Sequence, residues 1–525
     1  MLINKMFKKT LIGVVILLLL LSGCSDDDDL QGTGQGNEME TISSNLIYIP
    51  VERIRTLNPI LSKDEDAYYL NNLVYQGLFT LNANLEAVGV LAESYEYTAT
   101  GSLLLHLAKG VTWHDGNAFS AEDVKFSIDA YKSVPVNKQG LHAEAVSLIK
   151  SVKVTDPFAV EIQFVDQNNA AIENLTFPIL PAHKFKRPAD MLKAEEDFFP
   201  MGTGPYWVSN IEEGRQIALS GNPGFKGSVP KNILAFKFMP GKADSLNLFE
   251  LGEINLTYLR DVERDTLIEK KSVNIVSFTA NEAEVLGFNF SHGALQQADV
   301  RKAIAHAVDS DIILETCYFN SGILNDSIYY PGYLGSETGI SAYGQDVSKG
   351  RELLKASGNE GLSLRLIFNS DNHSRNLAAG VIRANLEKIG INVEAIPLIK
   401  EDYEKSLAKG DYDLYIGGFM FGENYDLRPL LHTGGAMNYI RYSNIRMDEL
   451  LTRMQQGITP EERRDVFKEL HALYKEEIPY LCLLYKTYGF AASKDLQGEI
   501  NPYFYNVYNG CEKWRMTYQK PAGQP

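Results

Sequence analysis

Cysteine is scarce in this chain, with four residues among 525. The four positions, Cys24, Cys317, Cys482 and Cys511, are too far apart to form a CxxC pair or a zinc-binding pattern. Disulfide scaffolds are typical of much smaller secreted domains, so we expect none here. A single bridge among the last three cysteines stays open.

Motifs that carry catalysis are also missing. The sequence has no GxSxG, no HExxH, no P-loop and no GxGxxG before a helix. Carboxylates are plentiful, so a glycosidase-like acid pair is not excluded by count, but no ordered motif indicates one. The nine histidines are scattered, and we interpret His183 and His432 as surface or cleft residues. We therefore expect no catalytic residue, no metal site and no cofactor.

Positive charge is in deficit, with 50 Lys and Arg against 67 Asp and Glu and a net charge of −17. An acidic surface repels phosphates, which argues against a nucleic-acid partner. The apolar content of 45% and the charged content of 22% are typical of a soluble globular protein. A chain of 525 residues is too long for one hydrophobic core, so two or three domains are expected.

The apolar run near the N-terminus is too short to span a bilayer. Leu11 to Leu21 is 11 residues long, whereas a spanning helix needs about 20. Three lysines precede the run and the sequence Leu21-Ser22-Gly23-Cys24 ends it. This pattern is typical of a signal peptide, and its end resembles the lipobox of bacterial lipoproteins. The resemblance implies a lipoprotein signal peptide over 1–23 and a lipid anchor on Cys24. An ordinary secretory signal with a chance cysteine is the alternative.

Residues 24–42 are rich in Asp, Gly and Gln, with four consecutive aspartates from Asp26 to Asp29. They offer almost no apolar side chains to bury, so we predict a disordered tether. The aspartates could chelate a cation, but a solvated run of charge is the simpler interpretation.

The most informative stretch spans residues 91–128. A polar break precedes the leucine-rich run 103–107, which predicts a strand. The sequence His114-Asp115-Gly116-Asn117 predicts a turn. Ser120, with Asp123 three residues later, predicts a capped helix that runs through Ile128.

In order, these residues read LAESYEYTATGSLLLHLAKGVTWHDGNAFSAEDVKFSI, which closely resembles the signature segment of the family 5 extracellular solute-binding proteins. That family contains the peptide-binding subunits of ABC importers. Further resemblances follow in the family's order at Leu57-Asn58-Pro59, YQGLF (75–79), GTGPY (202–206), GNPGF (221–225) and Tyr442-Ser443-Asn444. The likeness runs from about residue 45 to 515 and implies the family's fold.

That fold is α/β, with the two lobes of a type II periplasmic-binding protein and an extra subdomain inserted in the first lobe. The expected first lobe comprises 43–76, 203–284 and 488–520, the inserted subdomain 77–202, and the second lobe 285–487. Residues 285–290 and 480–485 resemble the two strands that cross between the lobes.

The pattern within the second lobe supports this expectation. Strands at 362–368, 392–396 and 412–416 alternate with helices at 373–389 and 402–408, which indicates parallel βαβ packing. An amphipathic helix is predicted over 299–316. Thr459-Pro460-Glu461-Glu462 predicts a capped helix that continues to Glu477.

The predicted ligand site lies in Gly417–His432, GGFMFGENYDLRPLLH, because ligands gather where parallel strands end. The resemblance implies that Asp426 contacts the ammonium of a peptide N-terminus, with Glu423 as a plausible substitute. The alternative is that Asp426 only caps the turn toward Arg428.

Other candidates complete the predicted site. The backbone of Phe421 and Gly422 would meet the ligand main chain, as would Asn289 in the first crossing strand. Arg428 would face a ligand carboxylate or be solvated. Trp113 and Tyr442 would form aromatic walls, with core packing as the alternative for Trp113.

The resemblance therefore implies a lipid-anchored, extracytoplasmic receptor for short peptides, which closes on its guest and delivers it to the transmembrane subunits of an ABC permease. We expect a monomer on the cell surface or in the periplasm. The same fold binding a nickel chelate, an opine or an oligosaccharide is the main alternative. An exported hydrolase or a signalling adhesin is the alternative from another class.

Overall fold

The computed structural model describes residues 39–52, 54–193, 198–259, 273–341 and 343–521. The chain divides into two units, one made of 1–42 with 519–525 and the other of 43–518. The predicted signal peptide and Cys24 lie outside the described residues, as does the tether up to residue 38. Its last residues, 39–42, belong to strand β1 and therefore correct the predicted end of the tether. The two lobes belong to the second unit.

The elements have the following bounds. The helices are α1 Glu65–Val74, α2 Ala121–Lys132, α3 Ala143–Ser147, α4 Lys242–Glu250, α6 Gly293–Gln296, α7 Ala298–Ala307, α8 Ser310–Ile312, α9 Val347–Ala356, α10 His373–Lys388, α11 Lys400–Lys409, α12 Arg428–Leu431, α13 Ile445–Met454 and α14 Pro460–Glu477. The strands are β1 Met39–Ser44, β2 Leu46–Val51, β3 Phe79–Leu81, β4 Ala87–Gly89, β5 Ala92–Tyr97, β6 Leu103–Leu107, β7 Ile149–Asp156, β8 Ala159–Phe164, β9 Tyr206–Glu212, β10 Gln216–Gly221, β11 Ile233–Phe238, β12 Leu256–Leu259, β13 Val273–Phe288, β14 Gly322–Ile323, β15 Ser363–Asn369, β16 Asn392–Leu398, β17 Leu414–Met420, β18 Tyr480–Ser493, β19 Leu496–Gln497 and β20 Arg515–Pro521.

The stretch 91–128 folds as its sequence predicts. Strands β5 and β6 pair antiparallel, and Gly101 between them has a φ of +79°, a conformation that glycine adopts without strain. Helix α2 begins with a capping box, in which the backbone N–H of Ser120 donates to Asp123 at 2.8 Å. With β7 and β8, the hairpin forms a four-stranded sheet in the order β5-β6-β8-β7.

The GTGPY motif brings the chain back to the first lobe. The backbone N–H of Gly204 donates to the carbonyl of Val74 at 2.9 Å. A Cβ at Gly202 would lie 1.9 Å from that carbonyl oxygen, so only glycine fits. Strand β9 then starts the sheet β2-β11-β10-β9. Both ends of the predicted inserted subdomain, near 77 and 202, therefore meet at the end of α1.

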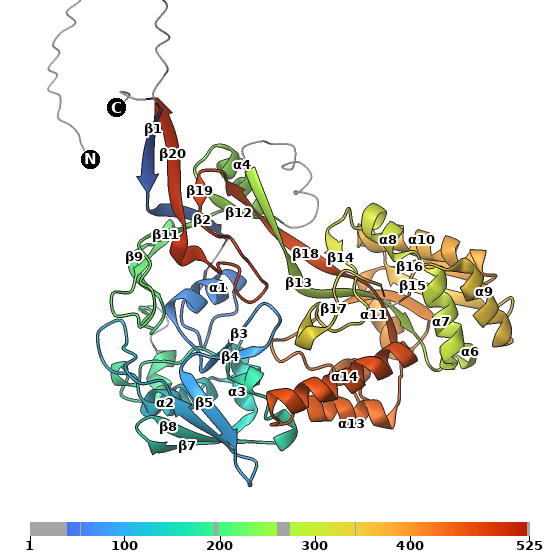
Figure 1. Ribbon diagram of the computed structural model, residues 1–525, viewed down its shortest axis with the longest axis horizontal. Helices are drawn as coiled ribbons and strands as arrows, with labels where there is room; N and C mark the ends of the chain where they lie inside the picture. Colours follow the sequence, from blue (N-terminus) through green and yellow to red (C-terminus); the bar gives the residue numbers. More distant parts are fainter. Residues whose placement is uncertain (1–38, 53, 194–197, 260–272, 342, 522–525) are drawn as a thin grey trace, which may run out of the picture. The chain divides into compact units, whose positions relative to one another are not determined.

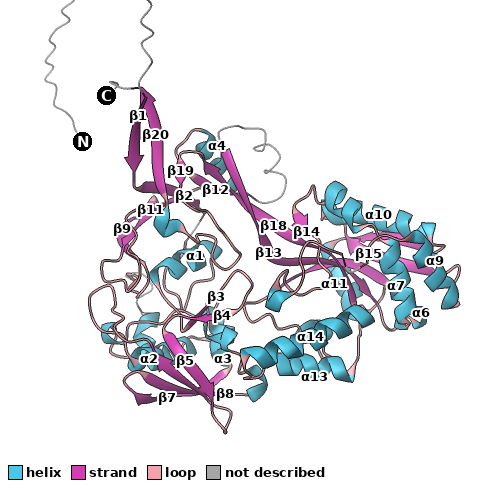
Figure 2. Ribbon diagram, in the orientation of Figure 1, coloured by secondary structure: helices cyan, strands magenta, loops and turns pink. Residues whose placement is uncertain are grey.

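The second lobe is built on parallel strands, as predicted. β15 pairs parallel with both β16 and β17. Leu366 and Phe368 on β15 face one hydrophobic core, and Ile367 between them faces another, because successive side chains of a strand point to opposite faces. The sheet is therefore covered on both faces, and Figure 2 shows the helices that flank it.

Strands β13 and β18 join the two lobes. They run side by side over most of their length, antiparallel (Figure 1). Phe278 on β13 belongs to the core of the first lobe, whereas Leu286 on the same strand belongs to a core of the second. The crossing segments predicted from sequence were 285–290 and 480–485. Both strands are longer, because β13 begins already at Val273 and β18 continues to Ser493. The predicted boundaries between the lobes, at 284/285 and 487/488, fall inside these two strands. We keep the terms first lobe, inserted subdomain and second lobe for the predicted residue ranges.

The predicted single helix over 299–316 is wrong. Helix α7 ends at Ala307, and Val308 is extended, with φ −70° and ψ 125°. Asp309 then caps the start of the short helix α8 by accepting a hydrogen bond from the N–H of Ile312 at 3.1 Å. A π-helical turn follows over Ile313–Cys317. The apolar periodicity continues through the break, which is why the sequence suggests one helix. The competing signal is the capping side chain of Asp309.

Candidate ligand-binding site

The candidate site is formed around residues 421–428, which we name the interlobe loop. The loop follows β17, at the carboxyl end of the parallel strands, where α/β lobes place their ligands. Its side chains contact the first lobe and the inserted subdomain. Asn424 donates to the side chain of Asn174 at 3.1 Å, and Glu423 accepts from Tyr68. The loop is therefore a place where the two lobes meet.

Asp426 is neutralised by its neighbour Arg428. The guanidinium Nε of Arg428 lies 2.9 and 3.0 Å from the two carboxylate oxygens, and a terminal nitrogen donates to one of them at 2.6 Å. The Arg428 N–H also donates to Asp426, at 2.9 Å. The same guanidinium donates to the carbonyl of Asn168 at 3.0 Å and to the side chain of Asn169 at 2.5 Å. Bidentate pairing of this kind is among the strong charge-assisted contacts.

Glu423 has different partners. It accepts hydrogen bonds from the Tyr68 hydroxyl at 2.7 Å and from the Thr176 hydroxyl. Within the described part of the chain, no ion pair joins this half-buried carboxylate to Lys, Arg or His. Burial, and then Glu423, raises the pKa of Tyr68, so its phenol keeps its proton and donates. Burial lowers the pKa of the nearby His142, and Glu423 opposes that shift.

The backbone of Phe421 is occupied by the crossing strand. Its N–H donates to the carbonyl of Asn281 at 3.1 Å, and its carbonyl accepts from the Asn281 side chain at 2.5 Å. Gly422 is exposed, and its carbonyl accepts from the N–H of Tyr425 at 3.2 Å. Of the two predicted backbone contacts, Gly422 is the better placed to meet a ligand.

Asn289 and Tyr442 lie at the other end of β17. Asn289 follows β13, whose Phe288 pairs with Leu414 at the start of β17. Its side chain donates to the carbonyls of Gly410 and Tyr412, at 3.1 and 2.6 Å. Seven residues of strand separate that end from the interlobe loop, a length of about 20 Å.

Both predicted aromatic walls are core residues. Tyr442 is buried and packs edge-on against Phe290, with ring centroids 5.1 Å apart. Trp113 is buried in the core of the first lobe and its inserted subdomain, near Phe119 and His183. The structure thus brings Phe421, Gly422, Asp426 and Arg428 together and leaves Asn289, Tyr442 and Trp113 elsewhere. Their roles toward a ligand stay predictions.

A charged network lies on the crossing strands beside the loop. Glu284 on β13 is 1% exposed and accepts from two nitrogens of Arg375, at 2.8 and 3.0 Å. Lys486 on β18 lies 3.4 Å from Glu284 and 3.2 Å from Glu282. Burial lowers the pKa of Arg375, but the Glu284 carboxylate outweighs it, so the pKa is raised.

Sequence reasoning missed most of these residues. Tyr68 and Thr176 reach Glu423 from positions 355 and 247 residues away, and nothing local marks either one. Glu282 and Glu284 did carry a signal, because they stand two residues apart, and so on one face of a strand, directly before the apolar run that begins at Val285. The predicted strand began at Val285 and so excluded them.

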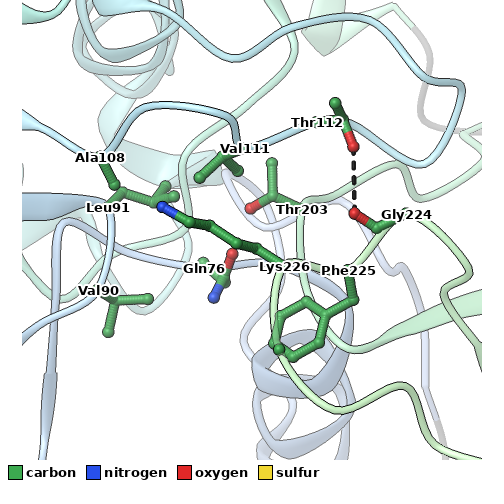
Figure 3. Close-up of a pocket in the computed structure, with 11 residues that line it drawn as sticks. Gln76, Val90, Leu91, Ala108, Val111, Thr112, Thr203, Gly224, Phe225 and Lys226 are labelled. Carbon is green, nitrogen blue, oxygen red and sulfur yellow. Dashed lines mark hydrogen bonds between the residues drawn. The ribbon is translucent and has the colours of Figure 1, made fainter.

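Two cavities near the surface do not involve the interlobe loop. One, of about 220 Å³, is lined by the first lobe and its inserted subdomain. Figure 3 shows Lys226 extending across it, and the Lys226 ammonium donates to the carbonyl of Lys109 at 2.8 Å. The other, of about 350 Å³, is lined by residues of α4, β18 and β20 and their neighbours.

The described residues hold no cluster built for a metal. They contain no group of three or more His, Cys, Asp or Glu placed to bind one. Cys317, Cys482 and Cys511 are buried and free. Among the helices within the described ranges, none has the length and apolarity that a membrane crossing requires.

Known proteins resemble this chain over most of its length. The oligopeptide-binding protein AppA of Bacillus subtilis is 24% identical over 97% of this chain and 98% of its own. The dipeptide-binding protein of Escherichia coli is 23% identical over 79% of this chain and 84% of its own. The crystal structure of the ABC transporter substrate-binding protein CtaP from Listeria monocytogenes superposes with a TM-score of 0.73. Its identity is 20%, over 90% of this chain and 99% of that one.

CtaP shares the two-lobed type II periplasmic-binding fold, which confirms the predicted fold class. The profile of the bacterial extracellular solute-binding proteins, family 5, matches residues 86–437. That segment includes most of the inserted subdomain, both residues of the Asp426–Arg428 pair and the whole interlobe loop. The chain therefore belongs to the bacterial extracellular solute-binding proteins, family 5.

Proposed function

We propose that this protein is a lipid-anchored, extracytoplasmic receptor of an ABC importer that binds short peptides between its lobes and delivers them to the permease. Relatives named for dipeptide and oligopeptide binding support the ligand class. The sequence of the first 24 residues supports export and the anchor on Cys24. Two or more acyl chains on that residue would hold the protein stably at a membrane. We propose that it acts as a monomer and performs no chemistry on its ligand.

The observation that carries the proposal is the Glu423 carboxylate, which bonds to two hydroxyls and to no cation within the described residues. A carboxylate has about four acceptor sites, so Glu423 can accept further donors. A peptide ammonium supplies both the donors and the missing charge. We therefore assign the ammonium to Glu423 rather than to Asp426, whose charge Arg428 already balances.

The position of Glu423 also couples binding to closure. Glu423 belongs to the second lobe, whereas Tyr68 lies on α1 and Thr176 in the inserted subdomain. An ammonium held at Glu423 would touch groups from both sides, and these contacts exist together only when the lobes are shut. A ligand that binds the closed state better shifts the population toward it.

The test is calorimetry with the mature chain and a set of dipeptides and tripeptides. Free peptides should bind saturably, whereas the same peptides with acetylated N-termini should not. Glu423→Gln should weaken binding tenfold or more, because losing the partner of a desolvated charge costs about 2–5 kcal/mol. Asp426→Asn is the matched control, and its affinity should stay within about threefold of wild type.

Three outcomes would count against parts of this proposal. A larger loss in Asp426→Asn than in Glu423→Gln would return the ammonium to Asp426. No binding of any peptide, with saturable binding of a metal chelate or a sugar, would overturn the ligand class. Cys24→Ser should release the protein from the membrane fraction and abolish labelling by fatty acid, and an unchanged distribution would contradict the anchor.

A further inference from the structure

Tyr425 occupies an unusual backbone conformation within the interlobe loop. Its φ is +47°, in the left-handed region. Side chains with a Cβ avoid that region, and glycine and asparagine enter it most readily. A tyrosine persists there only when its surroundings hold it, and such outliers cluster at ligand sites. The ring of Tyr425 must therefore make contacts that a glycine could not make.

The ring is fully enclosed by other aromatic side chains. Tyr425 is 3% exposed, and its hydroxyl donates to the carbonyl of Ile328 at 3.0 Å and contacts the hydroxyl of Tyr485. The rings nearest to it belong to Phe421, at 4.6 Å, and Tyr333, at 5.7 Å. Tyr329 and Tyr330 lie at 6.3 and 6.4 Å. We name these walls, with Tyr485, the aromatic box.

The aromatic box is held together by contacts that do not involve Tyr425. The Tyr485 hydroxyl donates to the carbonyl of Ile328 at 2.6 Å, and the Tyr330 hydroxyl donates to the carbonyl of Thr279 at 3.0 Å. Tyr333 packs edge-on against Phe467 of α14, with centroids 5.2 Å apart. The buried Tyr329 hydroxyl has no hydrogen-bond partner in the described part of the chain. The box should therefore keep its shape, and its unused polar atom, when the Tyr425 ring is removed.

The aromatic box and the proposed ammonium site share the interlobe loop. Tyr425 is two residues from Glu423, and Phe421, on the other side of Glu423, forms one wall of the box. A peptide whose ammonium lies at Glu423 would thus place a neighbouring side chain toward the space that Tyr425 fills. Close-packed aromatic rings leave no room for a second bulky group.

We propose that Tyr425 is a specificity-determining residue that fills a side-chain pocket of the ligand site. With its ring in place, the receptor accepts small side chains beside the ammonium and excludes aromatic ones. Without the ring, the aromatic box would accept a phenyl or phenol group of the ligand. This inference rests on the proposed function, because it needs a peptide held at Glu423.

The experiment compares the affinities of wild type and three variants for Ala-Ala, Phe-Ala and Ala-Phe by calorimetry. Tyr425→Gly removes the ring and suits the backbone. Relative to Ala-Ala, its affinity for one of the two aromatic dipeptides should rise at least tenfold over wild type. Tyr425→Asn also tolerates the left-handed backbone and should shift the ratio in the same direction, which protects the test if the glycine variant does not fold. Tyr425→Phe keeps the ring and should leave the ratio unchanged.

An unchanged ratio in a folded glycine or asparagine variant would overturn the inference. So would a phenylalanine variant that behaves like the glycine variant, because the effect would then follow from the hydroxyl and not from the ring. Melting curves without ligand establish which variants are folded. If neither wild type nor any variant binds these dipeptides or the tripeptides of the earlier test, the proposed function itself fails, and the inference fails with it.

Discussion

Two glutamates near the place where the lobes meet differ in their burial and in the charge of their partners. Glu284, on the crossing strand β13, is fully buried and is paired with Arg375 and Lys486. Glu423, on the interlobe loop, is half-buried and has only hydroxyls as partners among the described residues. A fully buried carboxylate must be paired, since an isolated one would cost several kcal/mol. A half-buried carboxylate is still partly solvated, so it can remain without a cationic partner until a ligand supplies one.

The difference separates structure from function. A carboxylate whose charge is balanced and whose acceptor sites are filled holds two elements together and has little left to offer a ligand. Glu284 and Asp426 are of this kind. A carboxylate that has only neutral donors keeps a net charge and free acceptor sites. Removing a partner, and measuring whether stability or binding changes, tests this contrast.

The largest effect is expected from Arg375→Met. This change leaves Glu284 buried with Lys486 as its remaining cation, and breaking a buried pair from one side costs about 3–5 kcal/mol. Urea denaturation should show that loss in the free energy of unfolding. Lys405→Met is the control, because Lys405 pairs with Glu401 on the exposed surface of α11 at 2.7 Å, where such pairs contribute about 0–1 kcal/mol. Equal losses of unfolding free energy in the two variants would contradict the structural role assigned to the Glu284–Arg375 pair.

His114 shows a third way to bury a titratable group, which is to keep it neutral. Its Nδ1 accepts from the N–H of Gly202 at 3.2 Å, a bond that requires that nitrogen to be unprotonated. Burial lowers its pKa from 6.5 to about 4. The side chain thereby fixes the point where the inserted subdomain returns to the first lobe.

Stability should therefore fall as the pH falls from about 6.5 toward 4, because in that range only the unfolded chain takes up the proton. The expected loss is about 2 kcal/mol, after allowance for the partly exposed ring. Denaturation curves across this range should be steeper in pH for wild type than for His114→Gln. The half-buried His142 has a lowered pKa too and contributes in the same direction in both proteins, so the difference isolates His114. Parallel profiles would contradict the assignment.

The parts of the molecule that sequence reasoning predicts well are those fixed by local chemistry. The capping side chains of Ser120 and Thr459 predict where α2 and α14 begin, because a cap satisfies N–H groups a few residues away. The same reasoning fails at Asp309, where a continuous apolar stripe hides the cap.

The candidate site is predictable only in part, for a physical reason. Its loop can be located, since ligands gather where parallel strands end. The sequence does not predict which acid in that loop lacks a cationic partner among the described residues. That depends on partners that lie hundreds of residues away, such as Tyr68 and Thr176. The pairing of Asp426 with Arg428 is local and is one of the two alternatives that the sequence offers.

The smallest effect on the free protein is expected from Glu423→Gln. A glutamine keeps an oxygen that can accept from Tyr68 or Thr176 and buries no unpaired charge, so the free energy of unfolding without ligand should change by less than about 1 kcal/mol. The variant should differ from wild type once peptide is present. At a concentration of 100 times the wild-type Kd, a ligand stabilises the folded state by about 2.7 kcal/mol. A tenfold weaker Kd reduces that stabilisation to about 1.4 kcal/mol. Thermal melts with and without peptide measure both quantities in one series. Strong destabilisation of the free variant, as expected for Arg375→Met, would place Glu423 with the structural acids and remove the distinction between them.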